Sequence, residues 1–80
     1  MTLEDPFERI NREMKWQEKA SDILKELYNG SSSAITESDE EKFTIIKSME
    51  YFMDHNQEKY RDREGIEYYL RIKSFIKNLE

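Results

Sequence analysis

The sequence predicts a small all-α protein, and three observations support that prediction. The 80-residue chain contains glycine at two positions and proline at one, so turn-forming residues are rare. Helix-favouring residues fill the long stretches between them. Apolar residues recur at steps of three and four. We expect a single domain over residues 1–80, folded as a small antiparallel three-helix bundle or a helical hairpin, in which dimerisation is one way to complete a modest core.

The first helix is expected over residues 5–29. Asp5 offers a side-chain acceptor for an N-cap, Pro6 suits the first helical position, and Glu8 follows at the third. Gly30 is a typical helix terminator because it tolerates positive φ angles. The small polar residues that follow predict a flexible linker over residues 30–38.

A second helix is expected over residues 39–54, because Ser38 and Glu41 have the spacing of a capping box. The acidic residues around this position suit the positive end of a helix dipole, so they need no metal or nucleic-acid function. The apolar residues predict one broad buried face on this helix. That face would contain Phe43, Ile46, Met49 and Met53, flanked by Ile45 and Phe52.

The apolar pattern lapses over a polar connection at about residues 54–62 and resumes in a third expected helix over residues 62–79. Its predicted packing seam contains Tyr69, Ile72, Ile76 and Leu79. The rival arrangement is a hairpin in which residues 39–79 form one nearly continuous helix.

The first helix carries two apolar stripes about a third of a turn apart. The outer stripe contains Leu3, Phe7, Ile10 and Met14, and the other contains Trp16, Ala20, Ile23, Leu24 and Leu27. One interpretation is that the helix bends, or that two helices of the same chain wrap the wide combined face. The other is that the C-terminal half of this helix packs inside the domain while a second molecule binds Phe7, Ile10, Met14 and Trp16.

The residue types give poor support for an enzyme, so we expect no catalytic activity. The chain has no cysteine, no glycine-rich phosphate loop and a single histidine, His55, in the polar connection. A lone histidine there is typical of a solvated or capping residue. We expect neither a metal nor another cofactor, because one histidine and no cysteine cannot supply a usual ligand set.

A basic and aromatic C-terminal segment leaves a nucleic-acid-binding regulatory protein as the alternative function. Its candidate contacts are Arg61, Arg63, Arg71, Lys73 and Lys77. These residues do not share one helical face, and the net charge of −5 opposes long-range attraction to phosphates.

The preferred function is a non-catalytic protein–protein interaction module, such as an accessory subunit, adaptor or inhibitor. It would bind itself as a homodimer, or a larger protein, through Phe7, Ile10, Met14 and Trp16. The longest apolar runs are three residues and the N-terminus lacks the features of a signal peptide, so we expect no membrane partner and a cytoplasmic location.

Overall fold

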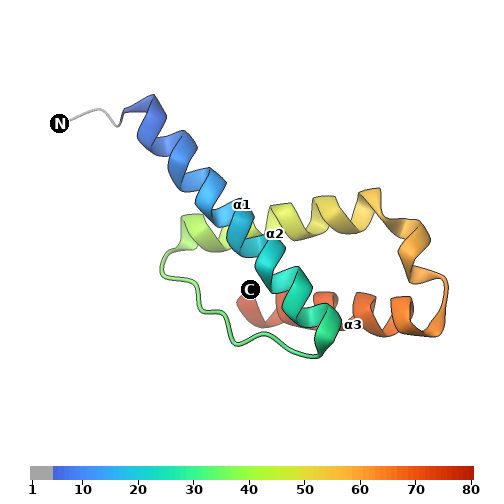
Figure 1. The fold of residues 1–80 in the computed structure, drawn as a ribbon. Coiled ribbons are helices and arrows are strands. Elements are labelled where there is room, and N and C mark those ends of the chain that lie inside the picture. The colour runs from blue at the N-terminus through green and yellow to red at the C-terminus, as the bar shows by residue number, and fades with distance from the viewer. Residues whose placement is uncertain (1–4) are drawn as a thin grey trace.

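The computed structural model describes residues 5–80, and this part of the chain is all-helical. The elements are α1 (Pro6–Asn29), α2 (Asp39–His55), a short 3-10 helix η1 (Gln57–Tyr60) and α3 (Arg63–Leu79). Helices α2 and α3 run in opposite directions and are joined through η1, while α1 crosses one face of this pair obliquely (Figure 1). The all-α prediction with three helices is confirmed. A continuous helix over residues 39–79 is wrong, because α2 ends at His55 and the chain turns through η1.

Local hydrogen bonds explain where the helices begin and end. The Asp5 carboxylate accepts a hydrogen bond from the Phe7 N–H at 2.9 Å, and the Ser38 hydroxyl accepts one from Glu41 at 3.1 Å. Asp62 caps α3 in the same way, accepting from the Gly65 N–H at 2.7 Å. Gly30 ends α1 with a φ of 150°, a backbone conformation open to glycine rather than the left-handed helical one that is commonest at this position.

The core lies where the second half of α1 crosses the other two helices. Its buried side chains are Ala20, Ile23, Leu24 and Leu27 of α1, Ile45, Met49 and Met53 of α2, and Tyr68, Ile72 and Ile76 of α3. Every buried residue of α1 lies at or beyond Ala20. The first half of this helix therefore contributes none of the buried core.

The predicted buried face of α2 is partly wrong. Phe43 is 63% exposed, whereas Ile45 and Met49 are fully buried. The buried side chains of α2 follow one another at steps of four, because α1 meets α2 along that line. Ile46 and Phe52 are half-buried at the edges.

The predicted seam of α3 is shifted at its start. Tyr68 is buried and Tyr69 is only partly buried, while Ile72 and Ile76 lie in the core as expected. The shift follows from the Tyr68 hydroxyl, which donates a hydrogen bond to the Leu24 carbonyl oxygen at 3.1 Å and so turns this side chain toward α1.

The 30–38 segment, expected to be a flexible linker, makes polar contacts with both neighbouring helices. Lys19 Nζ donates to the Ile35 carbonyl oxygen and to Glu41 Oε1, each at 2.5 Å. Glu41 Oε2 also accepts from the Glu37 N–H at 3.0 Å. Burial raises the pKa of the Glu41 carboxyl, but the Lys19 ammonium and the Glu37 N–H outweigh it, and the pKa falls below its ordinary value.

None of the helices in residues 5–80 has the length and apolar character needed to cross a membrane.

Candidate functional site

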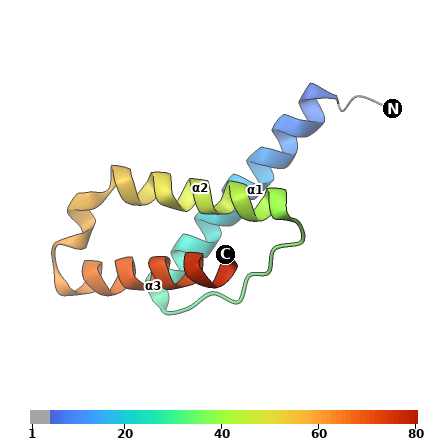
Figure 2. The ribbon, with the colours of Figure 1, turned by 180° about the vertical axis from the view of Figure 1, so that it is seen from behind.

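The first half of α1 projects away from the other helices as an arm (Figures 1 and 2). We call residues 6–19 the α1 arm, and its apolar residues Phe7, Ile10 and Met14 the arm stripe. These three side chains are 75%, 52% and 53% exposed, respectively. The expectation that helices of the same chain wrap both stripes is therefore wrong for the described part of the outer stripe. Leu3, the first residue of that expected stripe, lies outside them.

The arm is helical because its first turn is capped and charged side chains pair along its surface. Asp5 caps the first turn, and Pro6 occupies a position where a missing N–H costs nothing. Arg9 Nε lies 3.3 Å from Glu13 Oε1 in an i, i+4 pair on the solvated surface. These interactions stabilise the helix without covering the arm stripe.

Trp16 belongs to the base of the arm, although the sequence suggested it as a fourth contact residue. Its side chain is half-buried and packs against the core. At about 100° per residue, it faces roughly the opposite side of α1 from Phe7. The Arg12 guanidinium lies 5.3 Å from the Trp16 ring and 3.2 Å from Glu40 Oε1, so it ties this base to the start of α2.

A groove of about 580 Å³ opens between the arm and α2. Its lining residues are Glu13 and Gln17 of α1 and Phe43, Thr44, Lys47, Ser48 and Tyr51 of α2. Phe43 and Tyr51 are 63% and 66% exposed. Because Glu13 and Gln17 are the i+3 neighbours of Ile10 and Met14, the groove opens directly beside the arm stripe.

Sequence reasoning placed Phe43 inside the core and did not select Tyr51. One signal in the sequence could have found them, since Phe43, Lys47 and Tyr51 follow one another at steps of four and so share one helical face. Lys47 Nζ lies 5.5 Å from the Phe43 ring, and Tyr51 stacks on His55 with the ring centroids 3.9 Å apart. The arm stripe, Phe43 and Tyr51 together are called the docking face below.

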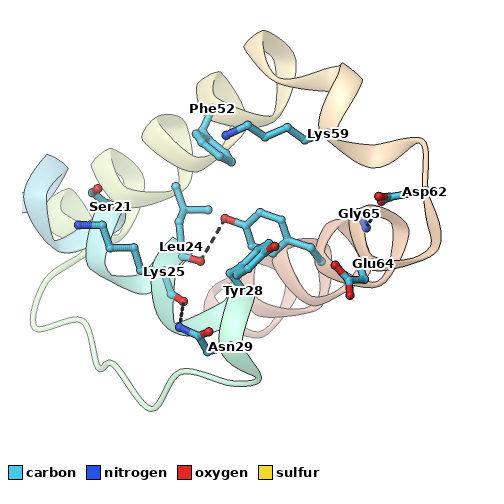
Figure 3. A pocket seen from close by; sticks show the side chains of 11 residues that line it. Ser21, Leu24, Lys25, Tyr28, Asn29, Phe52, Lys59, Asp62, Glu64 and Gly65 are labelled. Carbon is cyan, nitrogen blue, oxygen red and sulfur yellow. Dashed lines mark hydrogen bonds between the residues drawn. The ribbon is translucent and has the colours of Figure 1, made fainter.

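A second cavity, of about 630 Å³, lies between the second half of α1 and the start of α3 (Figure 3). Its aromatic wall contains Tyr28, Phe52 and Tyr68, and the Tyr28 and Tyr68 rings meet edge to face at 5.2 Å. Two of the polar groups around it serve the fold, since Tyr68 donates to the Leu24 carbonyl oxygen and Asp62 caps α3. Burial, with Tyr60 and Tyr28 nearby, raises the pKa of Tyr68 to about 12. Such a phenol stays protonated at neutral pH, so its chemistry there is that of a hydrogen-bond donor.

The candidate nucleic-acid contacts are not gathered on one surface. Arg71 Nη1 donates to the carbonyl oxygens of Leu27 and Tyr28 at 3.1 and 3.3 Å, so it caps the end of α1. Arg63 and Arg71 each lie within 4 Å of Glu67, at 3.6 and 3.9 Å. Lys73 Nζ lies 5.6 Å from the Tyr69 ring, while Arg61 and Lys77 are exposed.

His55 lies in the last turn of α2, where its Nδ1 is 2.9 Å from the Tyr51 carbonyl oxygen. Within residues 5–80, no three histidine, aspartate or glutamate side chains form a group that could hold a metal ion.

Comparison of the chain with protein-family models, with curated proteins and with solved structures finds no match.

Proposed function

We propose that this protein is a non-catalytic interaction module that binds another protein molecule through the arm stripe. The observation that carries the proposal is the contrast within α1. From Ala20 onward its core-facing apolar residues are buried, whereas Phe7, Ile10 and Met14 are each more than half exposed on one face. A regular apolar face that its own chain leaves uncovered is typical of helix-mediated recognition.

Burial of this face would supply a useful part of a binding free energy. Full burial of one large apolar side chain contributes about 1.5–3 kcal/mol, and the arm stripe presents three that are already partly covered. The surrounding charges would set orientation more than affinity. Glu13, the i+3 neighbour of Ile10, lies at the rim of the stripe, and Arg9 pairs with it at 3.3 Å.

The nucleic-acid alternative has weaker physical support. A phosphate-binding surface needs cationic groups that converge on one backbone. Arg71 is instead used to cap α1 and Arg63 is paired with Glu67. Lys73 and Lys77 then remain as a single exposed i, i+4 pair on α3, which is a small cationic surface for a nucleic-acid backbone.

The test is a double variant, Phe7→Ser with Met14→Ser, expressed as a tagged chain in its native cells. Gel filtration of the lysate should place the unaltered chain well above its 9.8 kDa monomer mass and the double variant at that mass. The matched control is Ile66→Ser with Leu70→Ser, which changes two apolar residues of α3 that are 48% and 59% exposed. The control should elute with the unaltered chain.

Circular dichroism of the purified double variant should retain its helix content, because neither side chain is part of the core. A double variant that elutes at the same large mass as the unaltered chain, or an unaltered chain that elutes as a monomer, would contradict the proposal.

A further inference from the structure

We infer that the docking face takes a second copy of this chain, with the two α1 arms crossing in an antiparallel pair about a two-fold axis near residue 12. The inference rests on the proposed function and names its partner. In this arrangement the arm stripes pack on each other, and Phe7 of each copy lies at the mouth of the partner's groove. The same surface serves both copies, as a two-fold interface requires.

The spacing of the arm stripe suits helix pairing. Phe7, Ile10, Met14 and Gln17 follow one another at steps of three, four and three, which is the repeat of a two-helix packing seam. Antiparallel pairing about residue 12 sets Ile10 opposite the partner's Met14. It also sets Phe7 opposite the partner's Gln17.

This register brings Phe7, the most exposed side chain of the arm stripe, to the groove between the arm and α2. Gln17 lines that groove together with the exposed Phe43 and Tyr51. Phe7, which is 75% exposed in the single chain, would therefore pack between two aromatic side chains of the other copy. In the dimer, the end of each arm thus fits the groove of the other copy.

Charge also favours the antiparallel direction. Glu8 and Lys15 are both exposed on the same side of the arm. Antiparallel pairing puts Glu8 at about the level of the partner's Lys15, whereas in-register parallel pairing puts each of these charges at the level of its own copy. Both charges lie off the seam, so this is a weak, long-range contribution. The opposed helix dipoles add to the same preference.

The aromatic side chains of the docking face supply roughly half of the area of a standard dimer interface. Phe7, Phe43 and Tyr51 are 63% to 75% exposed, and an aromatic side chain buries about 150–250 Å², so these three offer roughly 300–500 Å² per copy. Ile10, Met14 and the polar rim add to this, against about 800 Å² per partner in a standard interface. A small core without disulfides gains stability from such an interface.

Sedimentation equilibrium of the purified chain tests the pairing. We expect twice the 9.8 kDa chain mass for the unaltered protein and for Leu70→Glu, and the monomer mass for Met14→Glu. Met14 is 53% exposed and Leu70 is 59% exposed, so the two substitutions differ in place rather than in burial. An unaltered chain that stays monomeric up to about 1 mM would overturn the inference, because a contact of only about 4 kcal/mol would show there.

Cross-linking tests the direction of the pair, and the absence of cysteine makes single-cysteine variants unambiguous. Asn11→Cys lies near the proposed axis and should cross-link to its partner with a short bis-maleimide. Glu18→Cys should not, since the two copies of residue 18 would lie about 18 Å apart along the pair. Equal cross-linking of both variants would indicate a parallel pair and overturn the inference.

The two proposals fail in different ways. A lysate complex that depends on the arm stripe, combined with a monomeric purified chain, would refute self-pairing and leave the proposed function standing. A monomer both in the lysate and after purification would refute both.

Discussion

Lys19 Nζ and Glu41 Oε1 lie 2.5 Å apart, in a contact that joins α1, the 30–38 segment and the start of α2. Glu41 is only 5% exposed, and its second oxygen accepts the Glu37 N–H. A buried carboxylate of this kind stabilises a fold only while its partners remain in place. The contact fixes where α1 crosses α2, and with it the direction in which the arm leaves the core.

Substitution of Glu41 by Gln should lower the free energy of unfolding by about 1–3 kcal/mol, because Lys19 and the Glu37 N–H lose a charged acceptor. Urea unfolding at neutral pH measures the change. The control is Glu40→Gln, an exposed neighbour that pairs with Arg12, for which we expect a change within about 0.5 kcal/mol. Equal losses for the two variants would show that burial of Glu41 is unimportant.

The same residue predicts acid sensitivity. The pKa of Glu41 in the folded chain lies below its ordinary value of 4.5. The Glu41 carboxylate therefore contributes its full stabilisation above pH 4.5, and this stabilisation is lost as the pH falls through the pKa of the folded chain. The stability of the unaltered chain should fall more steeply in this range than that of Glu41→Gln, when both are followed by urea unfolding at successive pH values. Parallel curves would contradict the pKa direction.

Two tyrosines of the core should respond differently to removal of their hydroxyls. Tyr68→Phe loses the hydrogen bond to the Leu24 carbonyl oxygen and should destabilise the fold by about 0.5–1.5 kcal/mol. Tyr60→Phe should be neutral or stabilising, because the buried Tyr60 hydroxyl has no hydrogen-bond partner among the described residues. Thermal unfolding of the two variants side by side provides the comparison, and the reverse order would be inconsistent with this hydrogen bonding.

Alkaline pH should destabilise the protein through Tyr68. Burial holds the pKa of Tyr68 at about 12, above its ordinary value of 10.0, so the unfolded chain loses the proton first. Tyr68 contributes its full stabilisation below about pH 10. The free energy of unfolding should decrease by roughly 2–3 kcal/mol as the pH rises through about 12. Denaturant unfolding at several alkaline pH values measures this decrease, and Tyr68→Phe should show a shallower one. An equal slope in that variant would remove Tyr68 as the cause.

Gly65→Ala should destabilise the protein even though alanine is the better helix former. An added Cβ would overlap the Lys59 carbonyl oxygen, a backbone atom of η1 that cannot turn aside like a side chain. We expect a loss of about 1–3 kcal/mol where helix propensity alone predicts a gain of about 1 kcal/mol. Chemical denaturation measures it, with Ser74→Ala on the exposed face of α3 as a control that should gain a few tenths of a kcal/mol. A more stable Gly65→Ala would show that α3 does not approach η1 closely.

Local chemistry made the helix ends predictable from the sequence. Asp5, Ser38 and Asp62 cap the N-termini of α1, α2 and α3 through bonds to residues two or three positions away, and Gly30 ends α1 by its own backbone freedom. The two apolar faces of α1 were also predictable from the sequence, because their angular separation follows from helix geometry alone.

The faces that depend on contacts far apart in the sequence were not predictable in this way. Phe43 and Ile45 are both apolar and two residues apart, and only the crossing position of α1 decides that Ile45 is buried and Phe43 exposed. Trp16 is half-buried against the core, as its place in the second stripe indicates, and Arg12 lies over its ring. The groove beside the arm depends on which side chains of α2 are left exposed at this crossing. The sequence therefore predicted the arm stripe but only part of the docking face.

The most direct test of the arm stripe is photo-crosslinking in the native cells, with a photoreactive amino acid at Ile10 and, separately, at Leu70. The two positions are 52% and 59% exposed, so exposure alone predicts equal yields. A protein-sized product from Ile10 and none from Leu70 is the expected result. No product from Ile10, or equal products from both positions, would contradict a docking role for the arm stripe.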